Sequence, residues 1–231
     1  MTKIIFCTIL ILLTAFQCTA FAADVPKISV TGEGIVEAPP DCATISVGVV
    51  SRNIDATKVQ SENSRLAANI INSIAALGID KKNIRTGNYN FRQTYRSEDN
   101  NRRIFDGYEV SNSVTILVTD LSKVGKVIDT ALANGANQVD SLNFGIRDRE
   151  KFQNDALRLA VRDALKKAEI VAAELGKSIA GVNNISINHS SISAPVVERM
   201  SMANMDAKIS TPIETGTLNC SASVFVEFIM N

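Results

Sequence analysis

The chain has 231 residues, and its 24 lysines and arginines balance its 24 aspartates and glutamates. This balance argues against proteins that bind nucleic acid or anionic lipid through charge, so we expect no nucleic-acid partner. Apolar residues make up 45% of the sequence, which is enough for a packed globular core.

The first 22 residues have the pattern of a cleaved signal peptide. Lys3 gives a positive start, and the apolar run 4–15 is shorter than the roughly 20 residues that a membrane helix needs. Ala20 and Ala22 form the small-x-small pattern of a cleavage site. We therefore predict removal of residues 1–22 and one exported domain at 23–231, without a transmembrane segment. One alternative is that the segment is retained as a membrane anchor. The other is a lipid attached to Cys18, and Gln17 argues against it because a small residue is expected at that position.

The first half of the mature chain alternates between strand and helix patterns. Apolar and polar residues alternate at 28–35 and 43–51, which predicts two strands. Apolar residues then recur every three or four positions, which predicts a helix from 56 to 77 that ends at Gly78. Its stripe consists of Val59, Asn63, Leu66, Ile70, Ile74 and Leu77. Strand patterns at 84–95 and 105–119 flank a polar turn and predict a hairpin.

The second half predicts a helix at 121–134, a strand at 138–146, a long helix at 149–175, a short strand at 182–189 and a last strand at 217–229. Two apolar stripes on the long helix predict that it is mostly buried. The main stripe is Phe152, Ala156, Leu159, Ala160, Ala164, Ala168, Val171 and Leu175, and the second is Leu157, Val161, Leu165 and Ala172.

The order of these elements predicts an α+β fold. Between residues 43 and 146 the order strand-helix-strand occurs twice, which is typical of split βαβ units that form an antiparallel sheet with helices packed on one face. The rest of the chain is expected to add one long helix and the C-terminal strands to these units. Residues 190–216 fit no periodic template, and we interpret them as a loop or a subunit-contact segment.

The stretch Gly32-Glu33-Gly34 resembles part of a dinucleotide-binding fingerprint. It lacks the third glycine, and Pro39 and Pro40 follow it where a phosphate-binding helix would begin. We therefore predict a bulge or a bend in an edge strand.

No set of residues predicts catalysis. His189 is the single histidine, and the serines beside it lie in turn-like sequence without a nucleophile elbow. Asp140, Asp148 and Glu150 form a carboxylate cluster, in which Asp148 precedes the long helix and is expected to cap it or offset its dipole. We predict no catalytic residue, no cofactor and no classical zinc site, since one histidine and two distant cysteines do not supply four ligands.

Arginines and aromatic residues gather around the predicted hairpin turn. They are Arg92, Arg96, Arg102 and Arg103, with Tyr89, Phe91 and Tyr95 nearby. The combination resembles an RNA-binding surface, but an exported protein does not meet RNA, so we expect a solvated hairpin tip.

Export leaves two cysteines, Cys42 and Cys220, in an oxidising compartment. Cys42 is in phase with the polar residues of its strand and Cys220 with the apolar residues of its own. We therefore expect two separate thiols, and a Cys42–Cys220 disulfide is the alternative.

Three of the five methionines, Met200, Met202 and Met205, stand together in the segment without a pattern. Their thioethers suit Cu(I), and they are also a reversible sink for oxidants. A simpler interpretation is an adaptable apolar patch that contacts another subunit.

The ordered set of short motifs resembles the SIMPL-domain family of exported bacterial proteins, which includes periplasmic immunogenic and oxidative-stress defence proteins. The matching stretches are 30–34 with Pro40 and Asp41; Gly78 and Ile79, 84–86 and Tyr95; Gly107 and Tyr108; 118–121 with Gly125; 135–137 with Phe144; 156–160; Ala164, Lys167, Ala168, Leu175 and Gly176; and 212–214.

The resemblance implies a Gram-negative periplasmic protein with peripheral envelope or outer-membrane association, linked to oxidative stress and antigenicity, and no established reaction. We predict a non-enzymatic, self-associating protein, that is, a homo-oligomer. The observations for assembly are the Gly-rich N-terminal strand, which we expect to be uncovered, and the segment 190–216. The alternatives are a Cu(I)-binding or oxidant-scavenging protein that uses Met200, Met202 and Met205, and an enzyme of undetected type. Cys42 and Cys220 depart from the family pattern.

Overall fold

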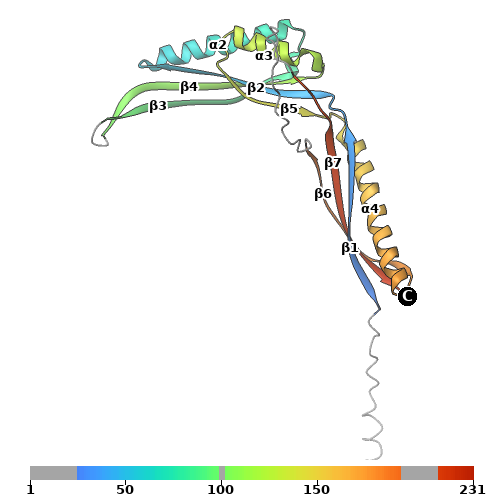
Figure 1. Ribbon diagram of the computed structural model, residues 1–231. Coiled ribbons are helices and arrows are strands. Elements are labelled where there is room, and N and C mark those ends of the chain that lie inside the picture. Colours follow the sequence, from blue (N-terminus) through green and yellow to red (C-terminus); the bar gives the residue numbers. More distant parts are fainter. Residues whose placement is uncertain (1–24, 99–101, 194–212) are drawn as a thin grey trace, which may run out of the picture.

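The computed structural model describes residues 25–98, 102–193 and 213–231. They form an α+β fold, as predicted, and the strands are antiparallel and divided between two separate sheets. Figure 1 shows the sheets as two arms that meet at an angle, each with its helices on one face.

The first arm is a four-stranded sheet in the order β3-β4-β2-β5, covered by two helices. Its elements are β2 (Cys42–Asn53), α2 (Ala56–Ala76), β3 (Ile84–Glu98), β4 (Arg102–Val118), α3 (Val124–Ala133) and β5 (Gln138–Gly145), with short 3-10 turns at Lys81–Asn83 and Leu121–Lys123. This order confirms the two split βαβ units, because β4 lies between β2 and β3.

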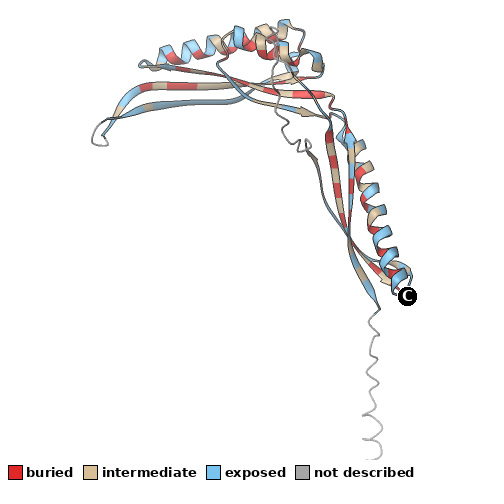
Figure 2. Cartoon of the chain, viewed as in Figure 1, coloured by how far each residue is buried: buried red, intermediate tan, exposed pale blue. Residues whose placement is uncertain are grey.

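The core of the first arm lies between the sheet and its helices. Alternate residues of β2 and β4, such as Val47 and Val114, face Ile70 and Ile74 of α2 and are buried. Figure 2 shows the buried residues gathered on this side, while β3 is mostly exposed. Among the described residues, no helix packs on the opposite face of the sheet, which we call the open face.

Asn63 lies within the apolar stripe of α2 and is fully buried. Its amide nitrogen donates to the carbonyl oxygens of Val49 (3.0 Å) and Val110 (3.1 Å). A buried carbonyl without a partner is costly, so these two hydrogen bonds hold α2 to β2 and β4.

The second arm is a three-stranded sheet in the order β1-β7-β6, with one helix packed on it. Its elements are β1 (Lys27–Ala38), α4 (Arg149–Glu174), β6 (Ile179–Ser193) and β7 (Leu218–Met230). β6 extends beyond the predicted short strand, so residues 190–193 belong to it and not to the segment without a pattern.

The prediction that α4 is mostly buried is wrong. Only one alanine stripe is fully buried, formed by Ala156, Ala160, Ala164, Ala168 and Ala172. Leu159, Val161, Leu165, Val171 and Leu175 remain 39–61% exposed. The reason is that a single three-stranded sheet covers one side of the helix, and in the described part of the chain no second layer packs on the other side.

The Gly-Glu-Gly stretch is architectural, but the predicted bulge or bend is absent from β1, whose pairing with β7 runs without a shift from Lys27 to Ala38. A Cβ added to Gly32 would lie 2.1 Å from the carbonyl oxygen of Ala160, and one added to Gly34 would lie 2.1 Å from that of Ala156. The glycines therefore let the backbone of α4 approach the backbone of β1.

The two arms share a small junction core. It consists of Ala38, Ile146, Leu218 and Cys220, with Phe152 packed against it. These residues come from the ends of β1, β5, β7 and α4, so the core lies where the chain passes between the arms.

We predict that Gly34→Ala destabilises the second arm by about 1–3 kcal/mol, because the added methyl group must push α4 away from β1. Urea unfolding measures the loss. The matched control is Gly181→Ala in β6, whose added Cβ meets no atom within 4 Å. Equal stability of the two variants would contradict the close packing.

Candidate functional site

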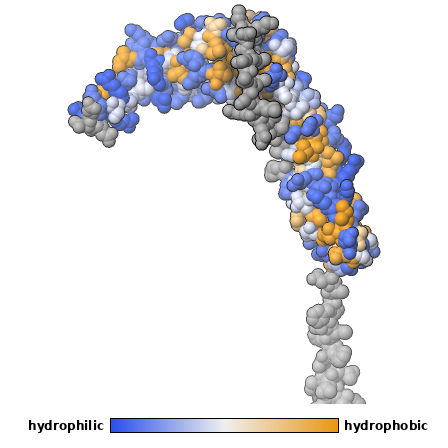
Figure 3. Space-filling view, viewed as in Figure 1, coloured by the Kyte–Doolittle hydropathy of each residue, from blue (hydrophilic) through white to orange (hydrophobic). Residues whose placement is uncertain are grey.

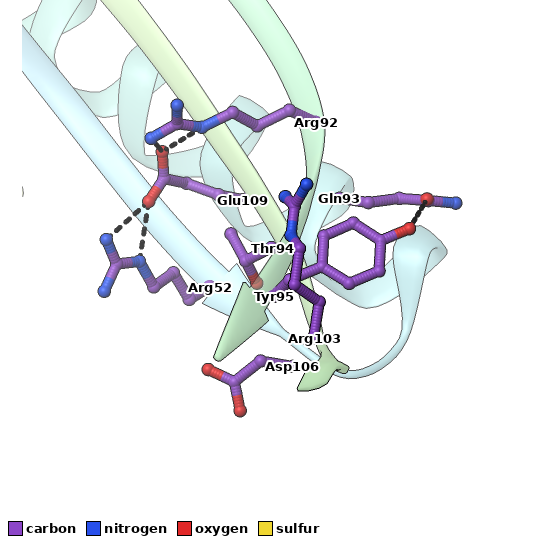
Figure 4. A pocket seen from close by; sticks show the side chains of 8 residues that line it. All are labelled: Arg52, Arg92, Gln93, Thr94, Tyr95, Arg103, Asp106 and Glu109. Carbon is purple, nitrogen blue, oxygen red and sulfur yellow. Dashed lines mark hydrogen bonds and ion pairs between the residues drawn. The ribbon is translucent and has the colours of Figure 1, made fainter. Parts of the chain in front are cut away.

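The open face of the first sheet carries a charged cluster at Glu109 of β4. The register places Arg52 of β2 and Arg92 of β3 opposite Glu109 on its two sides. Arg52 donates to Oε2 of Glu109 from Nε (2.6 Å) and approaches it with Nη2 (2.6 Å). Arg92 donates to Oε1 from Nε (2.9 Å) and approaches it with Nη2 (2.6 Å). Each carboxylate oxygen is thus held by one guanidinium group (Figure 4).

The ion pairs keep Glu109 charged although its side chain is only 7% exposed. Burial by itself acts to raise the pKa of this carboxyl. The hydrogen bonds and charges of Arg52 and Arg92 together outweigh burial and lower the pKa below its usual value.

A pocket of about 360 Å³ opens beside this cluster. Its lining consists of Arg52, Arg92, Gln93, Thr94, Tyr95, Arg103, Asp106 and Glu109. The guanidinium of Arg103 lies over the ring of Tyr95, 5.0 Å from the ring centre, and the Tyr95 hydroxyl donates to Oε1 of Gln93 (2.6 Å).

Sequence reasoning placed Arg92, Arg103 and Tyr95 at a solvated hairpin tip and missed Arg52 and Glu109. One signal was available. Glu109 is in phase with the polar residues Ser111 and Ser113 of its strand, so it had to lie on the open face, where cross-strand partners reach it.

A second surface lies on the other arm, between α4 and β6. Glu33 and Thr31 of β1 bond to Asp163 and Lys167, so the flank of α4 that carries 163 and 167 faces β1. The flank with Leu157, Val161 and Leu165 therefore faces β6. There, Val182, Ile185 and Ile187 lie on the same side of the sheet, since they pair with residues of β7 that pack under α4.

We call these six residues, Leu157, Val161, Leu165, Val182, Ile185 and Ile187, the apolar flank. Leu157 is partly buried, and the other five are 39–62% exposed. Figure 3 shows hydrophobic patches on this arm. Apolar side chains that gather on an exposed surface are typical of an interaction site.

The predicted carboxylate cluster does not form a catalytic pair. Asp140 accepts a hydrogen bond from Ser46 (3.2 Å), and Asp148 stands at the start of α4 but makes no side-chain capping bond. Asp148 is the N-cap residue of α4, as predicted, and its negative charge there can offset the helix dipole. Among the described residues, no group of three or more His, Cys, Asp or Glu side chains could hold a metal ion. His189 lies in β6, and its side chain is not among those that the structure describes.

Comparison with known proteins relates this architecture to a family. A family model described as SIMPL, a protein of unknown function (DUF541), matches residues 28–228. The chain belongs to the SIMPL family.

Three relatives show how far the similarity extends. The "26 kDa periplasmic immunogenic protein" of Brucella melitensis is 29% identical over 232 residues, which cover 95% of this chain and 93% of the relative. The protein of the same name from Brucella abortus is 28% identical with the same coverage. The "Uncharacterized protein YggE" of Escherichia coli K12 is 25% identical over 181 residues, 78% of this chain and 73% of the relative.

The two cysteines of this SIMPL protein are buried and free, and Cys220 belongs to the junction core. Burial, and next the neighbouring Asp41, raise the pKa of the Cys42 thiol, and burial raises that of Cys220. A raised pKa keeps a thiol protonated and less reactive. The alternative, a Cys42–Cys220 disulfide, stays a prediction. Titration of the thiols in the denatured, unreduced protein tests it, because two free thiols exclude the disulfide.

Several predictions for this SIMPL protein fall outside the described residues. These are the signal peptide at 1–22 and the methionines Met200, Met202 and Met205. No helix in the described part of the chain is long and apolar enough to cross a membrane.

We predict that Glu109→Gln reduces the acid sensitivity of the fold. The lowered pKa of Glu109 in the folded state means that its pairing stabilises the protein above the ordinary pKa near 4.5 and that this contribution is lost as the pH falls through the lower folded value. The stability difference between the wild type and Glu109→Gln should therefore be largest at neutral pH and shrink in acid. Urea unfolding over a series of pH values measures it.

The control for this experiment is Glu62→Gln, at an exposed position on α2. It should follow the wild type at every pH. A Glu109→Gln difference that stays constant from neutral to acid pH would show that the pKa is not lowered.

Proposed function

We propose that this protein is a periplasmic SIMPL-family protein without catalytic activity that self-associates through the apolar flank. The names of the Brucella relatives support the periplasm. The observation that carries self-association is the exposure of the apolar flank between α4 and β6.

The structure changes which strand is available for assembly. The Gly-rich strand β1 was expected to be uncovered, and this expectation is wrong, because α4 packs on it. On β1, the amide of Glu33 donates to Asp163 (2.9 Å), and the carbonyl of Thr31 accepts from Lys167 (3.0 Å). These bonds satisfy backbone groups that another strand would otherwise pair with.

β6 is the better edge for assembly. In the described part of the chain it pairs with β7 alone, so its other edge is free from Ile179 to Asn188. A second copy that places its own β6 antiparallel to this edge would extend the sheet and bring two apolar flanks together. Such a contact is self-complementary, which is the geometry of a twofold dimer.

The other proposed roles depend on the family resemblance. Oxidative-stress protection, antigenicity and outer-membrane association are properties that the resemblance implies, and no described residue adds to them. Binding of Cu(I) or scavenging of oxidants by Met200, Met202 and Met205 stays a prediction. An enzyme of undetected type also stays an alternative.

We predict that the protein has a mass of two or more copies by light scattering at micromolar concentration. Val161→Lys and Ile187→Lys should lower this mass while the circular dichroism stays that of a folded protein, because each places a charge in the apolar contact.

The matched control is Val171→Lys. Val171 is as exposed as Val161 and lies on the same helix, but it follows Lys167 by one turn and therefore lies on the flank toward β1. This variant should keep the wild-type mass. A monomeric wild type, or equal dissociation of Val171→Lys and Val161→Lys, would contradict the proposal.

A further inference from the structure

A polar hollow lies in the open face of the first sheet, over Gly48 of β2. One row of paired residues crosses all four strands at this level, in the order β3, β4, β2 and β5. The row consists of Asn88, Ser113, Gly48 and Gln138. Gly48 is the member of this row without a side chain, so the row has a gap near its centre.

On the β3 and β4 side of the gap, the side chains lie on the open face. Ser111 and Ser113 are in phase with Glu109 of the same strand, and Asn88 pairs with Ser113. Asn112 also lines the hollow, but the same alternation turns its side chain toward the helix face. This side of the hollow therefore offers two hydroxyl groups and one amide.

On the β5 side, Gln138 and Asp140 reach over the gap. Oε1 of Gln138 would lie 3.3 Å, and Oδ2 of Asp140 3.5 Å, from a Cβ added to Gly48. The same Asp140 oxygen accepts a hydrogen bond from the hydroxyl of Ser46 (3.2 Å). Side chains from β3, β4 and β5 thus surround one hollow of about 260 Å³ on a single face of the sheet.

Both edge strands carry a bulge next to this row. The pairing of β5 with β2 skips Asp140, and the pairing of β3 with β4 skips Gly87. A bulge re-aims a side chain and is common beside functional sites. In β5 the extra residue is Asp140, the one charged residue of the described lining. In β3 it is a glycine whose added Cβ would lie 2.9 Å from Oγ of Ser113, so the glycine leaves this hydroxyl uncovered.

The fold does not need a glycine at position 48. The nearest atoms to its added Cβ would be side-chain atoms of Gln138 and Asp140, at 3.3–3.5 Å, and its φ angle is not positive. At Gly32 and Gly34, by contrast, the added Cβ would lie 2.1 Å from a backbone oxygen. A glycine inside a strand weakens the strand, so what the missing side chain of Gly48 provides is the space of the hollow.

The charge of the hollow is negative and has no cation beside it. Asp140 makes no ion pair with a described residue. Arg85 and Arg52 occupy open-face positions on either side along the strands, but neither lines the hollow. A carboxylate without a cation favours a ligand that carries an ammonium group, because a charge-assisted hydrogen bond is stronger than a neutral one.

The neutral groups of the lining match hydroxyl groups. Each hydroxyl and each amide side chain can both donate and accept a hydrogen bond, and none has a partner among the described residues. These side chains are Asn88, Ser111, Ser113 and Gln138. A volume of about 260 Å³ is slightly below the range of sites for drug-sized ligands, so it suits a single sugar ring.

We propose that this hollow binds an amino sugar, that is, a small molecule with hydroxyl groups and a positively charged amino group. The ammonium group donates to Asp140, and the sugar hydroxyls bond to the serines and amides around Gly48. The hollow is on the opposite arm from the apolar flank, so this proposal is independent of self-association.

Isothermal titration calorimetry of the purified protein with glucosamine, glucose and ethylammonium tests the proposal. Mildly acidic buffer keeps the amino groups charged and a carboxylate ionised. Glucosamine should bind saturably. Glucose lacks the charge and ethylammonium lacks the hydroxyl groups, so each should bind at least about tenfold more weakly, because a charged hydrogen bond or several neutral ones are lost.

Two variants assign the binding to this hollow. Asp140→Asn keeps the shape of the side chain and removes its charge, so it should weaken glucosamine about tenfold or more and bring its affinity close to that of glucose. Gly48→Val fills the gap with a residue that strands favour, so it should stay folded by circular dichroism and lose binding. The control Glu62→Gln removes one negative charge from an exposed position on α2, on the other face of the sheet, and should bind as the wild type does.

Four results would overturn the proposal. The first two are the absence of saturable glucosamine binding and an equal affinity for glucosamine and either of the other two compounds. The third is a folded Gly48→Val or Asp140→Asn variant that binds as tightly as the wild type. The fourth is a Glu62→Gln variant that loses as much affinity as Asp140→Asn, which would show general charge attraction.

Discussion

The second arm depends on a contact between backbones, that of β1 with α4. Gly32 and Gly34 carry no side chain where the helix crosses them, and the nearest helix atoms belong to Ala156, Ala160 and Ala164, with Cβ of Leu159 beside Gly34. Packing at this distance gains many dispersion contacts over a short length. It also lets Asp163 and Lys167 bond to the backbone of Glu33 and Thr31 at the edge of β1.

This arrangement explains why the arm is incomplete on its other side. A helix drawn close to β1 also packs on β7 but makes fewer contacts with β6. The apolar residues of β6 and of the adjacent helix flank therefore stay exposed, and we propose that a second copy covers them. The first arm has a different exposed surface, since the open face of its sheet is polar and carries the Glu109 pocket. The fold thus has an exposed apolar flank on one arm and a charged pocket on the other.

The sequence predicted the order of the elements well, because apolar periodicity and the glycines after each helix are local signals, and Gly78 and Gly135 do adopt positive φ angles of 82° and 112°. It failed where the answer depends on contacts between distant residues. The Gly-Glu-Gly stretch predicted a bend because its partner, α4, lies about 130 residues later, as the bond from Glu33 to Asp163 shows. The two apolar stripes on α4 predicted that both would be buried. Only the alanine stripe is, because a sequence does not show how many layers of structure pack on a helix. Glu109 was missed since its partners become visible only once the strand register is known.

Hydrogen–deuterium exchange, measured at protein concentrations below and above the one at which the mass changes, tests the central claim most directly. The account predicts that, above this concentration, backbone amides of β6 and of α4 around residues 157–165 exchange more slowly, because a second copy covers them. Amides of the β3–β4 hairpin should exchange at the same rate in both conditions. Protection confined to the hairpin, with β6 and α4 unchanged, would contradict the claim that the apolar flank is the assembly surface.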